Sequence, residues 1–128
     1  MTNLIRIAVI DDHPLMRDGI VHVLGSLDKF DIVGEGETKD EAIEIASSQN
    51  PDLLLLDLSI PGGGLSAAQH VKEKFPDIKI VILTVSESEQ NVAAAMELGA
   101  SGYLLCPSAG SLRHGMSLRS ESLDHLVY

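Results

Sequence analysis

Three aspartates stand directly after two short apolar runs of the sequence. Asp11 and Asp12 follow a run that ends at Ile10. Asp57 follows a second run, which ends at Leu56. If both runs are parallel strands of one sheet, their carboxyl ends share an edge and bring the carboxylates together. Such a cluster repels itself unless a cation lies within it, and all-oxygen ligation suits Mg2+. The pattern therefore predicts a divalent-metal site.

Each acid taken alone also has a purely structural interpretation. Asp11 and Asp12 could cap the N-terminus of a following helix, where acids complement the helix dipole. Asp57 precedes the glycine-rich segment 58–64 and could be an ordinary loop residue. The joint placement of the three acids at strand ends favours the metal site.

Two further residues lie at or near the same predicted edge. Thr84 follows the apolar run that ends at Leu83, which places a hydroxyl where it could donate to a phosphoryl oxygen. Its alternative role is a strand-end threonine chosen for β propensity. Tyr103 lies in the last apolar run, and its alternative role is a packed aromatic.

Five apolar runs and four amphipathic segments alternate along the chain. The runs are nearly continuous in hydrophobicity, which is typical of parallel strands covered by helices on both faces. The predicted strands are Leu4–Ile10, Asp31–Glu35, Leu53–Leu56, Ile78–Leu83 and Gly102–Leu105. The predicted helices are Pro14–Leu24, Lys39–Ser48, Leu65–Phe75 and Gln90–Leu98. This alternation predicts an α/β fold with a doubly wound parallel sheet.

The first predicted helix and the tail of the chain differ in their apolar patterns. The first carries the apolar residues Leu15, Ile20, Val23 and Leu24. The tail, residues 108–128, is interrupted by glycines and rich in serine, so a fifth helix there would be short or atypical.

Composition narrows the classes of function. The chain has 128 residues, 45% of them hydrophobic and 22% charged, which predicts one domain, residues 1–128, with a real core. A net charge of -10 disfavours direct binding to nucleic acid. The single cysteine, Cys106, cannot form an internal disulfide. No signal peptide or membrane-length apolar run is present, so we expect a cytoplasmic location and no membrane partner.

Four segments, in this order and at these strand ends, resemble the receiver domains of bacterial two-component response regulators. They are Ile7–His13, Leu53–Gly62, Ile80–Thr84 and Gly99–Leu105. The resemblance covers roughly residues 4 to 107, and the Asp-Asp-His-Pro and Gly-Tyr-Leu-Leu sequences resemble the LuxR-type subfamily in particular. It implies a single five-stranded sheet with the flavodoxin-like order 2-1-3-4-5 and helices on both faces.

The resemblance also implies roles for individual residues. Asp57 would accept a phosphoryl group from the phosphohistidine of a partner kinase. Mg2+ would be bound by Asp57 and Asp12, by Asp11 through water, and by the backbone carbonyl of Ser59. The hydroxyl of Thr84 would then bind the phosphoryl group, and Tyr103 would move inward as part of a two-state switch.

This sequence departs from the family pattern in two places. Receivers usually carry a lysine after the fifth strand, and here Cys106 takes that position, followed by Pro107. A neutral thiol cannot supply the missing cation, and carboxylates nearby would raise its pKa, so we expect a passive Cys106. LuxR-type regulators continue into a helix-turn-helix domain, which we do not expect within these 128 residues.

Three functions remain open from the sequence. The first is a phospho-acceptor domain, not an enzyme, whose partners are a histidine kinase or phosphotransfer protein, a second copy as a homodimer, and DNA only through a separate effector domain. The second is a pseudo-receiver that serves interaction or dimerisation because Cys106 replaces lysine. The third is an aspartyl-phosphate hydrolase, disfavoured because Ser59 stands where such enzymes carry a second acid.

Overall fold

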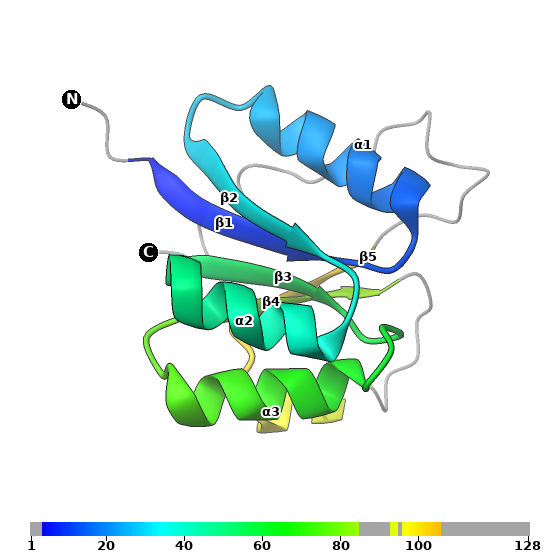
Figure 1. Cartoon of the computed structure of the whole chain (residues 1–128), viewed down its shortest axis with the longest axis vertical. Helices are drawn as coiled ribbons and strands as arrows, with labels where there is room; N and C mark the ends of the chain where they lie inside the picture. The colour runs from blue at the N-terminus through cyan, green and yellow to red at the C-terminus, as the bar shows by residue number, and fades with distance from the viewer. Residues whose placement is uncertain (1–3, 85–92, 95, 106–128) are drawn as a thin grey trace.

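A parallel β-sheet forms the centre of the structure. The computed structural model describes residues 4–84, 93–94 and 96–105. Its strands are β1 (Ile5–Ile10), β2 (Phe30–Gly36), β3 (Leu53–Asp57), β4 (Lys79–Thr84) and β5 (Gly102–Leu105). Neighbouring strands pair in parallel in the order β2-β1-β3-β4-β5 (Figure 1). The prediction of an α/β fold with a parallel sheet is confirmed.

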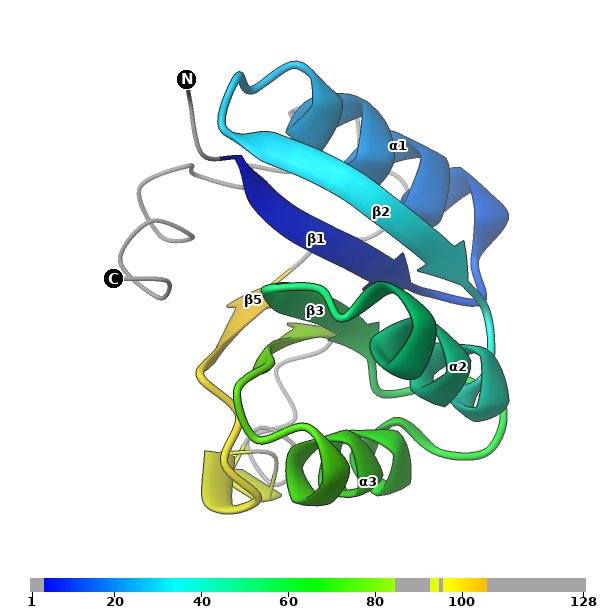
Figure 2. The same ribbon diagram turned by 60° about the vertical axis from the view of Figure 1, so that its left-hand side comes forward.

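Three helices connect the first four strands and cover both faces of the sheet. They are α1 (Pro14–Gly25), α2 (Lys39–Gln49) and α3 (Gly64–Lys74). Helix α1 lies on one face, and α2 and α3 lie together on the other (Figure 2). Of the predicted helix Gln90–Leu98, residues 93, 94, 96 and 97 are helical, whereas 90–92 and 95 lie outside the described residues. Within the described part of the chain, no helix is long and apolar enough to cross a membrane.

The side chains of β1 show why the strand sequence is almost continuously apolar. Ile7 and Val9 pack on the face covered by α1, whereas Ala8 and Ile10 pack on the face covered by α2 and α3. All four are fully buried. Successive residues of a strand point to opposite faces, so a strand covered on both sides has no solvent-facing positions. This arrangement holds β1 firmly and fixes where its carboxyl end lies.

Helix α1 differs from the predicted apolar pattern at Leu15. Leu15 is one of the apolar residues that the sequence places in this helix, but its side chain is 71% exposed. The buried residues are Met16, Ile20 and Leu24, which are spaced four apart and form one stripe along the helix. Leu15 lies one position off this stripe, about 100° around the helix from Met16. The apolar residues of this helix therefore do not all belong to the core.

The start of α3 lies against the end of β3 because residue 64 has no side chain. A Cβ atom built on Gly64 would lie 2.4 Å from the Cα atom of Leu58 and 2.7 Å from the carbonyl oxygen of Asp57. Backbone atoms cannot move aside as the tip of a side chain can. Gly64 thus allows the helix to begin directly beneath the loop that follows Asp57.

We expect Gly64→Ala to lower the free energy of unfolding by about 1–3 kcal/mol, the usual cost of overpacking a core. Gly25→Ala is the matched control, because a Cβ atom there meets nothing within 4 Å. Alanine is the better helix former, so the control should be neutral or slightly stabilising. Urea denaturation measures both variants. Equal stability of the two would show that the loop yields to the added methyl group.

Candidate metal centre

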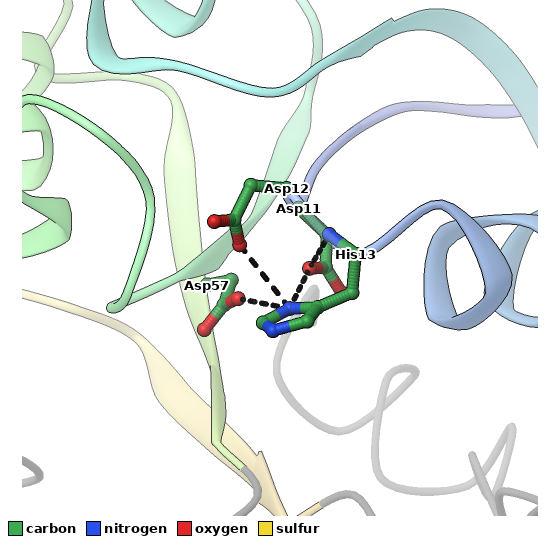
Figure 3. A group of neighbouring side chains, drawn as sticks. All are labelled: Asp11, Asp12, His13 and Asp57. Atoms are coloured by element: carbon green, nitrogen blue, oxygen red, sulfur yellow. Dashed lines mark hydrogen bonds and ion pairs between the residues drawn. The ribbon is translucent and has the colours of Figure 1, made fainter. Parts of the chain in front are cut away.

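The register between β1 and β3 brings two of the predicted site residues side by side. Ile10 pairs with Leu56, and each is followed by an aspartate, Asp11 and Asp57. Asp12 follows in the loop between β1 and α1. Figure 3 shows the three side chains converging on one region at the carboxyl edge of the sheet. The convergence expected from the sequence is present in the structure.

His13 also belongs to this cluster. Its ring atom Nδ1 lies 3.0 Å from Asp11 Oδ1, 3.1 Å from Asp12 Oδ1 and 3.4 Å from Asp57 Oδ2 (Figure 3). One ligand atom from each of the four residues can be chosen so that all lie within 4.8 Å of one another. His13 belongs to the Ile7–His13 segment, whose sequence pattern predicted no role for its side chain. The available signal was an imidazole directly adjacent to paired aspartates at a strand end.

Asp11 is the deeply buried member of the cluster, with 2% of its surface exposed. Burial raises the pKa of the Asp11 carboxyl above its ordinary value, because the charged form loses hydration. The Asp57 side chain raises it further, and hydrogen bonds from the His13 backbone and ring lower it in part. Without a bound cation, the ionised form of Asp11 therefore destabilises the folded protein.

The pKa of His13 is raised, chiefly by the hydrogen bond to Asp11. The negative charges of the three aspartates act in the same direction, and burial opposes them. The ring thus offsets part of the negative charge of the cluster in the protonated state.

One atom of the cluster has no hydrogen bond to satisfy it. Asp12 Oδ1 is buried and accepts none, although His13 Nδ1 lies 3.1 Å away. A buried carboxylate oxygen without a donor is costly, and a divalent cation is the partner that three neighbouring carboxylates suit. The residues present therefore fit a hard divalent ion such as Mg2+.

Contacts across the fold hold Asp11 in place through its backbone. The Asp11 N–H donates to the Gly36 carbonyl at 3.0 Å, and the Asp11 carbonyl accepts from Arg17 Nη1 at 2.7 Å. The same guanidinium pairs with Glu37 at 3.0 Å and with Glu35 at 3.5 Å. Arg17 thus links α1 and the end of β2 to the loop that carries Asp11 and Asp12. No sequence pattern predicts this role, because Arg17 resembles an ordinary surface residue of a helix.

Ser59 holds the Asp57 carboxylate with two hydrogen bonds. Its N–H donates to Oδ1 at 3.2 Å, and its hydroxyl donates to Oδ2 at 2.9 Å. These bonds fix the carboxylate at the rim of the cluster, where 13% of its side chain is exposed. The role of the Ser59 carbonyl as a metal ligand stays a prediction.

The remaining predicted site residues are placed only in part. Thr84 is the last residue of β4, and Tyr103 lies in β5 opposite Ile82. The side chains of both lie outside the described part of the structure, as does Cys106. Their predicted contacts with a phosphoryl group therefore stay predictions.

Comparison with known proteins gives the family. Residues 7–114 match the response regulator receiver domain. The nitrate/nitrite response regulator protein NarL of Escherichia coli K12 is 41% identical over 100 residues, which are 77% of this chain and 46% of that protein. The chain spans about half the length of the curated relatives it matches.

Solved structures agree with this match. The receiver domain of NarL from Mycobacterium tuberculosis has a TM-score of 0.82 at 30% identity, and the likeness covers 97% of each chain. A LuxR family two-component response regulator from Aurantimonas has a TM-score of 0.83 at 26% identity, over 98% of this chain and 86% of that one. The chain belongs to the response regulator receiver domain family and is a LuxR-type receiver domain of a two-component system.

The burial of Asp11 leads to a test of the metal-free protein. At neutral pH with chelator, Asp11→Asn should raise the melting temperature by a few degrees, equivalent to about 1 kcal/mol. Asparagine keeps an oxygen for the His13 N–H but removes the buried charge. Folding raises the pKa of Asp11, so the gain in melting temperature should be fully present at pH values above that raised pKa. It should vanish below the ordinary aspartate pKa, where Asp11 is protonated in both the folded and the unfolded protein.

Differential scanning calorimetry across pH measures this effect, with Asp18→Asn on the exposed side of α1 as the control. A lower melting temperature for Asp11→Asn near pH 8 would contradict the expectation. It would mean that the surroundings favour the ionised form of Asp11 even without metal.

Proposed function

We propose that Asp57 is the phospho-acceptor of this receiver and takes its phosphoryl group from a histidine kinase or a phosphotransfer protein. The observation that carries the proposal is the cluster itself. Asp57 stands at the carboxyl end of β3, held by Ser59 and directly beside the acids that follow β1. An acceptor needs a nucleophile at the rim of the site, where a donor can approach in line.

The transfer step is an in-line displacement at phosphorus. A carboxylate oxygen of Asp57 attacks, the bond between phosphorus and the donor imidazole nitrogen breaks, and that nitrogen keeps the electron pair and takes up a proton. Asp12, Asp57, the Ser59 carbonyl and, through water, Asp11 would hold Mg2+, which would supply positive charge to the phosphoryl oxygens. The Ser59 hydrogen bonds orient the carboxylate, and Arg17 holds the Asp11 backbone beneath it.

We further propose that residues 1–128 form one doubly wound, five-stranded receiver domain that acts in the cytoplasm. The hydroxyl of Thr84 binds the phosphoryl group, and Tyr103 follows it inward, which changes a surface read by a partner or by a second copy of the chain. Control of transcription then depends on an effector domain outside these 128 residues, which supplies the contact with DNA. In this role the domain accepts a phosphoryl group and is not a turnover enzyme.

The first test of this proposal is direct phosphorylation with a small acyl phosphate. With Mg2+, the chain should gain the mass of one phosphoryl group, and the gain should be lost in Asp57→Asn. Asp77→Asn is the matched control, since Asp77 is exposed and precedes β4 at the opposite edge of the sheet. An unchanged mass for the wild type, alongside a receiver known to react, would contradict acceptor function.

The second test concerns the cation that Cys106 does not supply. Cys106→Lys should raise the rate of phosphorylation by up to about a hundredfold, the effect of restoring one charge-stabilising contact in a transition state. Cys106→Ser, which stays neutral, should leave the rate unchanged. The measurement is the initial rate of phosphoprotein formation.

The outcomes of the second test separate two functions. A wild type that stays unmodified while Cys106→Lys reacts would identify a pseudo-receiver that has kept the fold but lost the cation. Equal rates for the wild type and Cys106→Lys would contradict the expectation that a missing cation limits transfer.

A further inference from the structure

His13 is placed so that its ring serves the acidic cluster and not the helix that it precedes. It is the N-cap residue of α1, in extended conformation with φ -101° and ψ 104°, and its side chain makes no capping hydrogen bond. Pro14 begins the helix and needs no donor of its own. The His13 side chain is 60% exposed, yet Nδ1 points into the cluster (Figure 3).

The distances around Nδ1 are those between ligands of one metal ion. In an octahedral site with bonds of about 2.1 Å, neighbouring ligand atoms lie about 3.0 Å apart and opposite ones about 4.2 Å apart. Nδ1 lies 3.0, 3.1 and 3.4 Å from an oxygen of Asp11, Asp12 and Asp57. The ligand atoms of all four residues fall within 4.8 Å of one another, slightly more than the distance between opposite ligands, so a small inward movement of the side chains would bring them around one ion. One ion can therefore contact the imidazole together with the carboxylates.

The cluster does not need the ring in order to hold Asp11. The His13 backbone N–H already donates to Asp11 Oδ1 at 2.9 Å, so the loop keeps its geometry without the imidazole. Asp12 Oδ1, meanwhile, is buried without a hydrogen bond and faces Nδ1 at 3.1 Å. Asp12 Oδ1 can therefore turn a lone pair toward a cation, and Nδ1 can do so once the cation displaces the proton of its hydrogen bond to Asp11.

An imidazole nitrogen changes which cations a carboxylate site prefers. Mg2+ takes oxygen ligands almost exclusively, whereas imidazole suits Zn2+ and its transition-metal neighbours. Three carboxylates alone would bind Mg2+ or Mn2+, but the same carboxylates with one nitrogen favour Zn2+.

We propose that His13 Nδ1 is a direct ligand in the receiver metal site and makes that site bind Zn2+ more tightly than Mg2+. The proposal rests on the proposed function, because Asp12 and Asp57 supply the other ligands. Zn2+ held in this way occupies the place that Mg2+ takes in phosphorylation. Free Zn2+ therefore inhibits phosphorylation of such a receiver even when the Mg2+ concentration stays the same.

The variant that tests the proposal is His13→Asn. Asparagine is a favoured N-cap residue, so α1 should form as before, and the backbone N–H to Asp11 is retained. The matched control is His22→Asn, which removes an exposed histidine from the last turn of the same helix. Circular dichroism and the melting temperature with chelator establish that both variants fold.

Three measurements on the untagged protein follow. Competition with a chromophoric chelator gives the affinity for Zn2+, and isothermal titration calorimetry gives that for Mg2+. We expect His13→Asn to lose at least about tenfold in Zn2+ affinity, because removal of a residue that only hydrogen-bonds to a metal ligand already costs that much in other proteins. Its Mg2+ affinity should stay within about twofold of the wild type or rise. Electron spin echo spectroscopy of bound Mn2+ should show 14N coupling in the wild type and in His22→Asn but not in His13→Asn.

The outcomes are separable. Unchanged Zn2+ affinity and unchanged 14N coupling in His13→Asn would overturn ligation by His13. An equal loss of Zn2+ and Mg2+ affinity would also overturn it, because His13 would then be a positioning residue for the carboxylates. A wild type that binds Zn2+, and whose bound Mn2+ shows 14N coupling, yet is not phosphorylated with Mg2+ would support the ligand and contradict the acceptor function instead.

Discussion

The repulsion between Asp11 and Asp57 is the constraint that the rest of the site accommodates. Ile10 and Leu56 pair in the buried ladder between β1 and β3, so the two acids that follow them cannot separate without breaking that ladder. Moving the strands apart would expose side chains whose burial stabilises the fold by about 1.5–3 kcal/mol each. The hydrophobic core therefore holds together charges that would otherwise move apart.

Neighbouring residues reduce this electrostatic cost without removing it. Arg17 donates to the carbonyl of Asp11, Ser59 donates twice to the carboxylate of Asp57, and His13 donates to Asp11. Even so, the pKa of Asp11 stays raised, and Asp12 Oδ1 stays without a hydrogen bond. A cation that binds in such a site lowers its free energy. This is the physical basis for metal binding at the carboxyl edge of the sheet.

Cations at this edge have two separate functions in a receiver. One is to neutralise the acids before any phosphoryl group arrives, which protonated His13 does in part until a metal ion displaces its proton. The other is to stabilise the phosphoryl oxygens, a function that lysine provides in the family and that Cys106 cannot provide as a neutral thiol. The proposed metal binding and the proposed phosphoryl transfer therefore depend on different residues of this protein.

The sequence by itself determined the strands and the edge at which the acids meet. Continuous apolar runs such as 53–56 have few other stable structures, and parallel strands must end on the same side. The tertiary structure decided that Leu15 is exposed, that the His13 ring turns into the cluster, and that Arg17 bridges to Glu37. These depend on loop dihedral angles and on partners distant in the sequence, such as Glu37 for Arg17 and Asp57 for His13, which local periodicity does not encode.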